Sequence, residues 1–459
     1  MSDITIYNYD FITPRLSEYK HVPLGQLYLI SILGEHGYDA ELKDFQFLHP
    51  LKWESIVSFF ENSSDIIGVG CTTQTLASLI LVLKEVKKKH PEKTVILGGP
   101  GPTDAAEEIL KAFPHIDIVV RGEAEKTIVE VMKSFEKNKK LKNIRGISYR
   151  EGNKIYVNPP RPRIENLDSI PFPAYEKIDV DKYSVIGVIS TRGCPYRCGF
   201  CSRGLWRNKV TSRTVDNLIE EIKLINEKYR KARLGINDDT FPLSKKKVFN
   251  FCNKLKRERI DINWSCYGRI NLMDEKIMKR MSESGCDNIF YGIESGSNKI
   301  LAKINKGFGV KMAEDILKIS RKYFHKITTS FIWGFPFETA EDFKKTIDMV
   351  KKIVFKWNIY SRLNILTPEK NTQIYAKYRD YVIPGFLNTP EIIFDSQYAP
   401  LKTLYTLHGQ KNLSKFLREY PLTSLIYYRY KTPNFSEKMK ILERFKKEYT
   451  LYREIKYSA

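Results

Sequence analysis

Three cysteines crowd into one short segment, STRGCPYRCGFCSRG, at Cys194, Cys198 and Cys201. The seven cysteines of this 459-residue chain are too few for a disulfide scaffold, and thiols grouped this closely are typical of metal or cluster chemistry. A structural zinc site normally has four ligands, and no histidine lies between His115 and His325 to supply a local fourth. Three cysteines suit a 4Fe-4S cluster in which one iron has no protein thiolate and stays open to another ligand. We therefore expect an iron–sulfur cluster here, with zinc completed by a distant ligand as the alternative.

The first 150 residues contain the elements of a parallel sheet. Helix-like amphipathic segments at 24–37 and 76–90 lie between short β-branched runs. The runs cover residues 4–9, 39–45, 65–71, 93–99 and 116–122. This alternation predicts a Rossmann-like α/β domain over 1–150, with ligands at the carboxyl ends of its strands.

A proline-rich stretch over 151–180 predicts an ordered linker, and a second set of strand-like runs follows it at a longer spacing. These runs cover residues 183–191, 232–238, 262–269, 287–295, 326–334 and 360–366. Helix-like segments separate them, so we expect a partial (β/α)6 TIM-type barrel over 181–400. The cysteine segment would form the loop after its first strand. The basic, Tyr-rich region 401–459 is predicted to be a small, mostly helical C-terminal domain that acts either as a lid or as a docking surface.

The chain is strongly basic, since 76 Lys+Arg minus 54 Asp+Glu gives +22. Such a charge suits an acidic partner, for example a redox protein, a nucleic acid or an anionic membrane surface, but a Lys-rich solvated surface explains it equally well. No apolar stretch approaches the roughly 20 residues of a spanning helix, and we expect a cytoplasmic protein. Four further cysteines, Cys71, Cys252, Cys266 and Cys286, are expected to be buried and inert.

Several segments, taken in order, resemble one known family. The cysteine motif with Phe200 before its last thiol is followed by NDDTF, by the strand-borne Arg269, by GIESGS and by FIWGFPFET. The N-terminal phrases VPLGQLYLISILGEHGYDAELKDF, GGPGPTDAAEEIL and RGEAEKTI, with LDSIPFPAY before the cluster, are similar to a cobalamin-binding domain and its linker. Over about residues 1–375 the chain therefore resembles a cobalamin-binding radical S-adenosylmethionine (SAM) enzyme.

The resemblance implies a role for each matching residue of the barrel. The three cysteines would hold the 4Fe-4S cluster, whose open iron takes the amino and carboxylate groups of SAM. Asp238 and Asp239 would lie near the SAM amino group, Arg269 near its carboxylate and Glu294 near its ribose, with Phe200 beside the cluster. The alternatives are a helix cap for the aspartates and ion pairs within the barrel for Arg269 and Glu294. Phe337 departs from the family pattern, which often has a small residue there, so the adenosine contact at this position is open.

For the N-terminal domain the resemblance implies a cobalamin site. No D-x-H-x-x-G motif occurs, so we expect base-off cobalamin without a histidine ligand. The residues expected beside the corrin are Thr72, Thr73, Gln74 and Thr75, and those expected beside the nucleotide tail are Gly98, Gly99 and Thr103. The alternative is a degenerate domain that binds nothing.

The function implied by the resemblance is methylation of an unactivated carbon through a 5'-deoxyadenosyl radical and methylcobalamin. A radical cyclase or rearrangement enzyme of tetrapyrrole or lipid type, or a non-catalytic cobalamin sensor, are the alternatives. A methylthiotransferase is disfavoured, because that family carries a second cysteine triad where this chain has only Cys71. The expected partners are a small-molecule, lipid or peptide substrate and a reductant such as flavodoxin or ferredoxin. Nucleic acid is not expected, and a peripheral membrane contact stays open.

Overall fold

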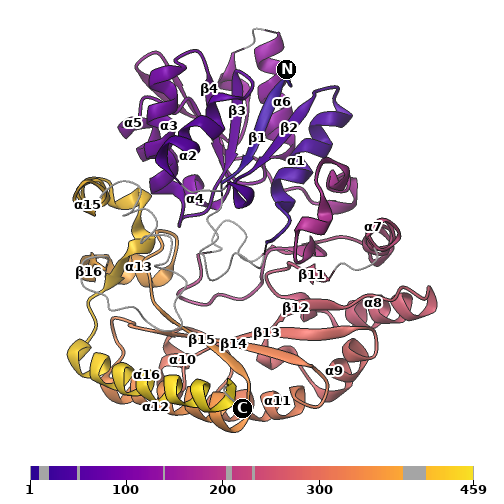
Figure 1. Ribbon diagram of the computed structural model, residues 1–459, viewed down its shortest axis with the longest axis vertical. Coiled ribbons are helices and arrows are strands. Elements are labelled where there is room, and N and C mark those ends of the chain that lie inside the picture. The colour runs from indigo at the N-terminus through magenta and orange to yellow at the C-terminus, as the bar shows by residue number, and fades with distance from the viewer. Residues whose placement is uncertain are drawn as a thin grey trace. The chain divides into compact units, whose positions relative to one another are not determined.

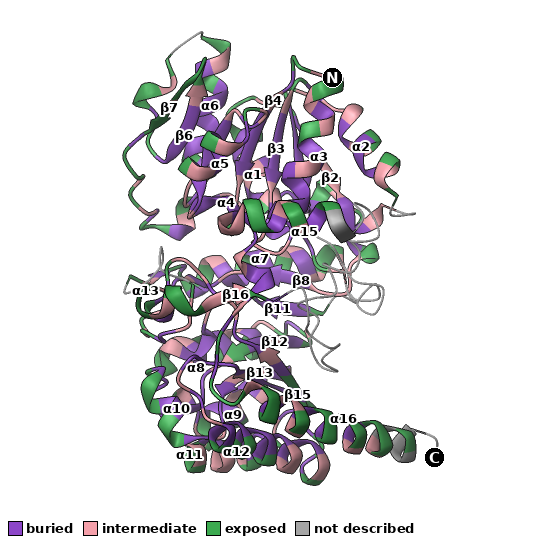
Figure 2. Ribbon diagram, turned by 90° about the vertical axis from the view of Figure 1, so that its left-hand side faces the viewer, coloured by how far each residue is buried: buried purple, intermediate pink, exposed green. Residues whose placement is uncertain are grey.

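The computed structural model (Figure 1) divides into two compact units. It describes residues 2–9, 20–48, 52–137, 140–202, 209–229, 233–385 and 410–457. The first unit comprises residues 1–186 and 398–427, and the second comprises residues 187–397 and 428–459. Each unit is built around its own sheet, and buried residues concentrate in the strands of both sheets (Figure 2).

The first unit contains a seven-stranded sheet in the order β2-β1-β3-β4-β5-β6-β7. Its five parallel strands confirm the predicted Rossmann-like fold. They are β1 (Ile4–Asn8), β2 (Ala40–Asp44), β3 (Ile66–Gly70), β4 (Thr94–Gly98) and β5 (Ile118–Val120). The antiparallel strands β6 (Ile147–Glu151) and β7 (Lys154–Val157) extend this sheet and were not predicted. Edge strand β7 is mostly exposed, so its sequence carries no alternation of buried and polar residues that could reveal it.

Helices connect the parallel strands of this sheet. Helix α1 packs with α6 and helix α2 packs with α3, as expected for crossovers in a doubly wound fold. The helices are α1 (Leu24–Glu35), α2 (Trp53–Glu61), α3 (Leu76–Lys89), α4 (Pro100–Thr103), α5 (Ala106–Ala112) and α6 (Glu125–Glu136). The loops that lead from strands into these helices therefore meet at one edge of the sheet, where the cofactor was expected.

A partly buried histidine of this unit, His115, should make the fold less stable in acid. His115 Nε2 lies 2.9 Å from the carbonyl oxygen of Ile80, and burial lowers the pKa of His115 from about 6.5 to about 4. The unfolded chain then binds a proton at a higher pH than the folded chain does. The free energy of unfolding should fall by roughly 2–3 kcal/mol as the pH drops from about 6.5 to about 4.

Urea unfolding of wild type and His115→Gln at pH 7 and pH 4.5 measures this effect. The wild type should lose more stability between the two pH values than the variant does. The control is His36→Gln, which removes an exposed histidine of the same unit. Equal pH dependence in wild type and His115→Gln would contradict the prediction.

The second unit contains a six-stranded sheet in the order β15-β14-β13-β12-β11-β8, which confirms the predicted partial barrel. The strands are β8 (Ile186–Val188), β11 (Leu234–Ile236), β12 (Trp264–Gly268), β13 (Cys286–Glu294), β14 (Lys326–Trp333) and β15 (Tyr360–Ile365). The neighbours from β11 to β15 pair in parallel, so their carboxyl ends meet at one edge. A short antiparallel pair flanks the three cysteines: β9 (Thr191–Arg192) lies before Cys194 and β10 (Thr211–Ser212) lies after Cys201.

Helices cover one face of this sheet (Figure 1). They are α7 (Val215–Lys228), α8 (Lys245–Arg257), α9 (Glu275–Ser282), α10 (Asn298–Lys303), α11 (Val310–Ser320) and α12 (Ala340–Lys351). Every second side chain of a strand points toward these helices. On β12 the Trp264 ring lies 5.5 Å from the Phe251 ring of α8, and on β14 the Trp333 ring lies 5.0 Å from the Phe343 ring of α12. The residues between them therefore point to the opposite face of the sheet.

The C-terminal region is helical, as predicted, but it is divided between the two units instead of forming one of its own. Residues 386–409, which include its predicted start at 401, lie outside the described residues. Helix α15 (Gln410–Glu419) belongs to the first unit, where the Phe416 ring lies 5.9 Å from the Phe113 ring. The C-terminal segment of the first unit ends at Tyr427, whose hydroxyl donates a hydrogen bond to the carbonyl oxygen of Gln74.

Residues 428–459 belong to the second unit. Strand β17 (Tyr428–Tyr430) pairs with β16 (Val382–Pro384), and helix α16 (Phe435–Tyr457) packs on α12. A second short helix of this unit is α13 (Gln373–Tyr378). Across the described part of the chain, the helices are all too short or too polar to cross a lipid bilayer.

Candidate functional site

The loop that carries the cysteines is held by backbone hydrogen bonds in its middle. The Gly199 N–H donates to the Ile304 carbonyl at 2.9 Å, and the Gly199 carbonyl accepts from the Ile374 N–H at 3.1 Å. Phe200 packs against an apolar cluster below the loop. That cluster comprises Ile300, Leu301, Ile304, Phe335, Leu366, Ile374 and Tyr430. Phe200 therefore anchors the loop in the core of the unit, and the cysteine side chains are available to bind a cluster.

The three thiols share this loop, but their side chains turn to different partners. Cys198 is buried, and its Sγ accepts a hydrogen bond from Arg269 Nη1 at 3.6 Å. The Sγ of Cys194 lies 3.7 Å from Thr240 Oγ1, and Cys201 is partly exposed. In the ranges that the structure describes, no three His, Cys, Asp or Glu side chains are gathered as a metal site. The donor set itself fits an iron–sulfur cluster, because three thiols lie within eight residues and a buried cation reaches one of them.

Arg269 directly follows β12 and lies against the cysteine loop. Its guanidinium group is 3.7 Å from the centroid of the Tyr196 ring, and its Nη2 donates to the Lys306 carbonyl oxygen. The Arg269 side chain is buried, and its Nε has no hydrogen-bond partner among the described residues. Burying a hydrogen-bond donor without an acceptor costs free energy. The Arg269 Nε is therefore suited to donate to an anionic group that binds at this site. The structure thus places Arg269 beside Cys198, and its predicted contact with the SAM carboxylate stays a prediction.

Glu294 ends strand β13 in a strained conformation. Its φ of +75° lies in the left-handed region, which costs energy for a residue other than glycine and is enriched at functional sites. Its Oε1 accepts from Lys306 Nζ at 2.7 Å, and both side chains are buried. The pair lies over Gly292, where a Cβ would collide with Glu294 Oε1. Gly292, the first glycine of the GIESGS segment, therefore leaves room for this ion pair.

Lys306 was missed by the sequence analysis, although it joins the predicted residues to one another. Its Nζ lies 5.6 Å from the centroid of the Phe200 ring, and its carbonyl oxygen accepts from Arg269. The only signal in the sequence is a lysine twelve residues after Glu294, at the end of the next short helix-like segment. Such a lysine looks like any solvated surface lysine until the fold brings it under the loop.

The two predicted aspartates differ in their surroundings. Asp238 is buried, and its carboxylate accepts four hydrogen bonds of 2.5–2.9 Å from the backbone and hydroxyl groups of Ser190 and Thr191. Burial raises the pKa of the Asp238 carboxyl, while these hydrogen bonds oppose the rise. The structure therefore uses Asp238 to fasten the segment just before the cysteine loop. Asp239 is partly exposed, and its contact with the SAM amino group stays a prediction.

In the first unit, the loops after β3 and β4 pack closely on each other. The Cys71 N–H donates to the Gly98 carbonyl at 3.1 Å, and a Cβ on Gly99, whose φ is +90°, would lie 2.8 Å from the Cys71 carbonyl oxygen. The hydroxyl of Thr103 donates to the Gly99 carbonyl at 2.7 Å. These contacts give Gly98, Gly99 and Thr103 a packing role in addition to the cofactor contact predicted for them.

The threonine-rich loop after β3 is partly open. Thr72, Thr73 and Gln74 are partly exposed, whereas Thr75 is buried and its N–H donates to the Thr72 carbonyl at 3.2 Å. The first three residues can therefore still face a ligand at the strand ends. Cys71, which precedes them, is buried as expected, and burial raises the pKa of its thiol.

A polar chain at the ends of β1 and β2 was not predicted. Gln26 Nε2 donates to Asn8 Oδ1 at 3.3 Å, and Asn8 Nδ2 donates to Asp44 Oδ1 at 2.9 Å. The hydroxyl of Tyr183 donates to Asp44 Oδ2 at 2.7 Å. The strand order reverses between β1 and β3, and open α/β sheets bind ligands at such a point. These two amides, the Asp44 carboxylate and the Tyr183 hydroxyl therefore belong to the candidate cofactor edge.

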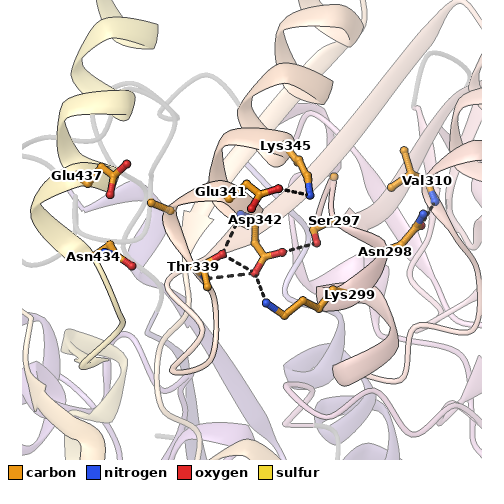
Figure 3. A pocket seen from close by; sticks show the side chains of 12 residues that line it. Ser297, Asn298, Lys299, Val310, Thr339, Glu341, Asp342, Lys345, Asn434 and Glu437 are labelled. Atoms are coloured by element: carbon orange, nitrogen blue, oxygen red, sulfur yellow. Dashed lines mark hydrogen bonds and ion pairs between the residues drawn. The ribbon is translucent and has the colours of Figure 1, made fainter.

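A surface pocket of about 620 Å³ lies elsewhere on the second unit (Figure 3). It is lined by residues of α10, α12 and the start of α16. Asp342 at its centre accepts hydrogen bonds from Ser297, Lys299 and Thr339; burial opposes its ionisation, yet these bonds lower its pKa to about 2. The carboxylate is thus already satisfied by protein groups, and none of the predicted site residues lines the pocket.

Each of the two units is similar to a known protein family. Residues 188–350 match the model of the radical SAM superfamily, and residues 15–132 match the model of the B12 binding domain. The uncharacterized methyltransferase PH0819 of Pyrococcus horikoshii is 35% identical over 77% of this chain and 77% of its own length. The anaerobic magnesium-protoporphyrin IX monomethyl ester cyclase of Synechocystis is 24% identical over 80% of this chain and 74% of its length.

Among solved structures, the radical SAM methyltransferase TsrM from Kitasatospora setae, with cobalamin and a [4Fe-4S] cluster bound, aligns with a TM-score of 0.68. The alignment covers 85% of this chain and 80% of that one at 15% identity, so it supports the fold. The two matched domains and the relative at 35% identity define the class, an N-terminal B12-binding domain joined to a radical SAM barrel. This chain belongs to the cobalamin-binding radical SAM enzymes.

Proposed function

We propose that this enzyme is a methyltransferase that acts on an unactivated carbon of a small-molecule substrate. The cluster would be held by Cys194, Cys198 and Cys201, and cobalamin by the strand ends of the first unit. The observation that supports this proposal most directly is the buried network of Cys198, Arg269, Lys306 and Glu294 at the cysteine loop. When bound, the cluster and SAM supply radical chemistry and cobalamin supplies the methyl group.

The residues of the chain bind and orient these groups. Arg269 places a buried cation beside Cys198, where it would offset the negative charge of thiolates and of a SAM carboxylate. Lys306 is also buried, and its Nζ lies near the Phe200 ring of the same loop. Glu294 accepts from Lys306 and keeps that cation in place. The apolar cluster under Phe200 keeps water away from the lower side of the loop.

The substrate and the electron donor come from outside the chain. TsrM has been solved with tryptophan bound, which is in keeping with a small-molecule substrate. The chain carries a net charge of +22, so we infer that a small acidic carrier such as flavodoxin or ferredoxin supplies the electrons. The similarity to the magnesium-protoporphyrin ester cyclase keeps a radical cyclase as the second candidate.

Anaerobic reconstitution with iron, sulfide and cobalamin tests the proposal. Under a strong reductant the protein should convert SAM to 5'-deoxyadenosine, and with its substrate it should form a product heavier by one methylene unit. A product that has lost hydrogen or gained oxygen would instead identify a cyclase. Failure to form 5'-deoxyadenosine with a filled cluster would reject both candidates and favour a cobalamin sensor.

A further inference from the structure

The face of the six-stranded sheet that the helices leave uncovered carries large side chains. Because side chains alternate along a strand, the residues between the helix-facing ones point to this open face. Tyr267 on β12 and Tyr360 on β15 lie there with 46% and 47% of their surface exposed, whereas their neighbours Cys266 and Ser361 are buried. The register places Tyr267 and Tyr360 in one row, with Phe290 and Thr328 between them, and large apolar groups gathered on one exposed face often mark a binding surface.

Three side chains on this face lie close enough to act together. The Tyr267 and Phe290 rings are 5.3 Å apart at their centroids, tilted by 60°. The guanidinium carbon of Arg362 on β15 lies 5.7 Å from the Phe290 centroid, so its side chain reaches across β14 toward β13. Arg362 is exposed, and among the described residues it has no ion pair or hydrogen bond. The face thus combines an aromatic platform with an arginine whose charge no carboxylate of the described chain neutralises.

The register of the sheet places this platform next to the network at the cysteine loop. Gly292 pairs with Ser330, and Ser330 pairs with Arg362, so the three residues form one row across β13, β14 and β15. The Glu294–Lys306 ion pair lies over Gly292 at one end of this row. Neighbouring strands are about 4.8 Å apart, so Arg362 is about 10 Å along the row from that network. A ring system of that length held by Arg362 would extend toward the cysteine loop.

We propose that this open face binds the substrate, and that the substrate is an aromatic or conjugated ring system carrying an oxyanion, a carboxylate or a phosphate. The rings would stack on Tyr267 and Phe290, and the oxyanion would accept hydrogen bonds from the Arg362 guanidinium. This inference rests on the proposed function, because it assigns the substrate of the same site.

Binding of 2-naphthoate and of its neutral analogue 2-naphthamide to the full-length protein tests the inference. Both probes fit the aromatic platform, but only 2-naphthoate carries an oxyanion. We expect 2-naphthoate to bind more tightly, and Arg362→Gln to weaken it about tenfold while leaving 2-naphthamide unchanged, because a charged hydrogen bond is lost. Phe290→Leu should weaken both probes. The matched control is Arg259→Gln, which removes an exposed arginine from the turn after α8.

Several outcomes would overturn the inference. They are equal affinity of wild type for the two probes, no binding of 2-naphthoate, and an Arg362→Gln variant that binds 2-naphthoate like wild type. A variant whose affinity for SAM falls while probe binding stays constant would show that Arg362 serves the cofactor instead. If Arg362→Gln fails to fold, Arg362→Lys keeps the charge and should lose only the two-pronged contact, with a smaller loss of 2-naphthoate affinity.

The same samples separate this inference from the proposed function. Probe binding needs no cofactor, so it is measured on protein with and without a reconstituted cluster. Absence of the cluster and of 5'-deoxyadenosine would reject the proposed function whatever the probes do. A filled cluster with 5'-deoxyadenosine formation but no preference for 2-naphthoate would reject only the substrate class.

Discussion

Cys198→Ala is expected to lose the visible absorbance of the 4Fe-4S cluster completely and to form no 5'-deoxyadenosine. A cluster with three protein ligands has no spare thiolate, so the loss of one leaves two irons without a protein ligand. Cys194→Ala and Cys201→Ala should behave in the same way, because the three thiols share one loop. Iron and sulfide content after anaerobic reconstitution, together with 5'-deoxyadenosine formation, measures the effect.

The control for these variants is Cys252→Ala, which removes a buried thiol from α8 and should keep the full cluster. Cobalamin binding provides a second readout. The cysteine loop lies outside the first unit, so each loop variant should still bind cobalamin with the absorbance of the base-off form. A loop variant that keeps a full cluster spectrum and still forms 5'-deoxyadenosine would show that the assignment of the cluster is wrong.

The second large effect concerns a buried ion pair that attaches helix α16 to the barrel. Lys438 Nζ lies 3.0 Å from Glu338 Oε2 and 2.7 Å from the Glu338 carbonyl oxygen, and both side chains are fully buried. Glu338 Oε2 also accepts from the Gly334 N–H at 2.8 Å. Burial raises the pKa of Glu338 and lowers that of Lys438, so each charge depends on the other. Lys438→Met should lower the free energy of unfolding by about 3–5 kcal/mol, because it leaves a buried carboxylate unpaired.

Urea unfolding followed by tryptophan fluorescence measures this loss, since the Trp333 ring stacks on the Phe435 ring of α16 at 6.0 Å. The matched control is Lys351→Met, which breaks a partly exposed pair between Lys351 of α12 and Glu448 of α16 and should cost less than about 1 kcal/mol. The double variant Glu338→Gln with Lys438→Met should recover part of the stability. A loss in Lys438→Met as small as that of Lys351→Met would contradict the buried pair.

This pair also has a consequence for the site. Glu338 belongs to the FIWGFPFET segment, and its carboxylate and backbone are fixed by a lysine that lies 100 residues later in the chain. In the same loop, the centroids of the Phe335 and Phe337 rings lie 5.6 Å apart, and Phe337 is the residue at which the adenosine contact was left open. We therefore expect Lys438→Met to weaken SAM binding as well as stability, whereas Lys351→Met should leave SAM binding unchanged and have only the small effect on stability given above.

The sequence predicted the five parallel strands of the first sheet, the six strands of the second sheet and the cysteine loop. These features rest on local signals, because β-branched runs such as residues 65–71 and 326–334 become strands and thiol spacing is a property of one segment. The sequence indicated site residues only where a motif contained them. For Asp238, Arg269 and Glu294 the motif identified the residue but not the group that it contacts in the fold. Edge strand β7 escaped detection because an exposed strand has no buried face to leave a pattern.

Tertiary structure alone decided which groups meet. Lys306 under the cysteine loop, Lys438 on Glu338 and Arg362 across from Phe290 are lysines and arginines that look alike in the sequence, where such residues usually lie on a solvated surface. Their different roles arise because folding removes two of them from water beside a carboxylate and leaves the third exposed on an open sheet face. The energy of a buried charge depends on what surrounds it, and those surroundings come from segments far apart in the chain.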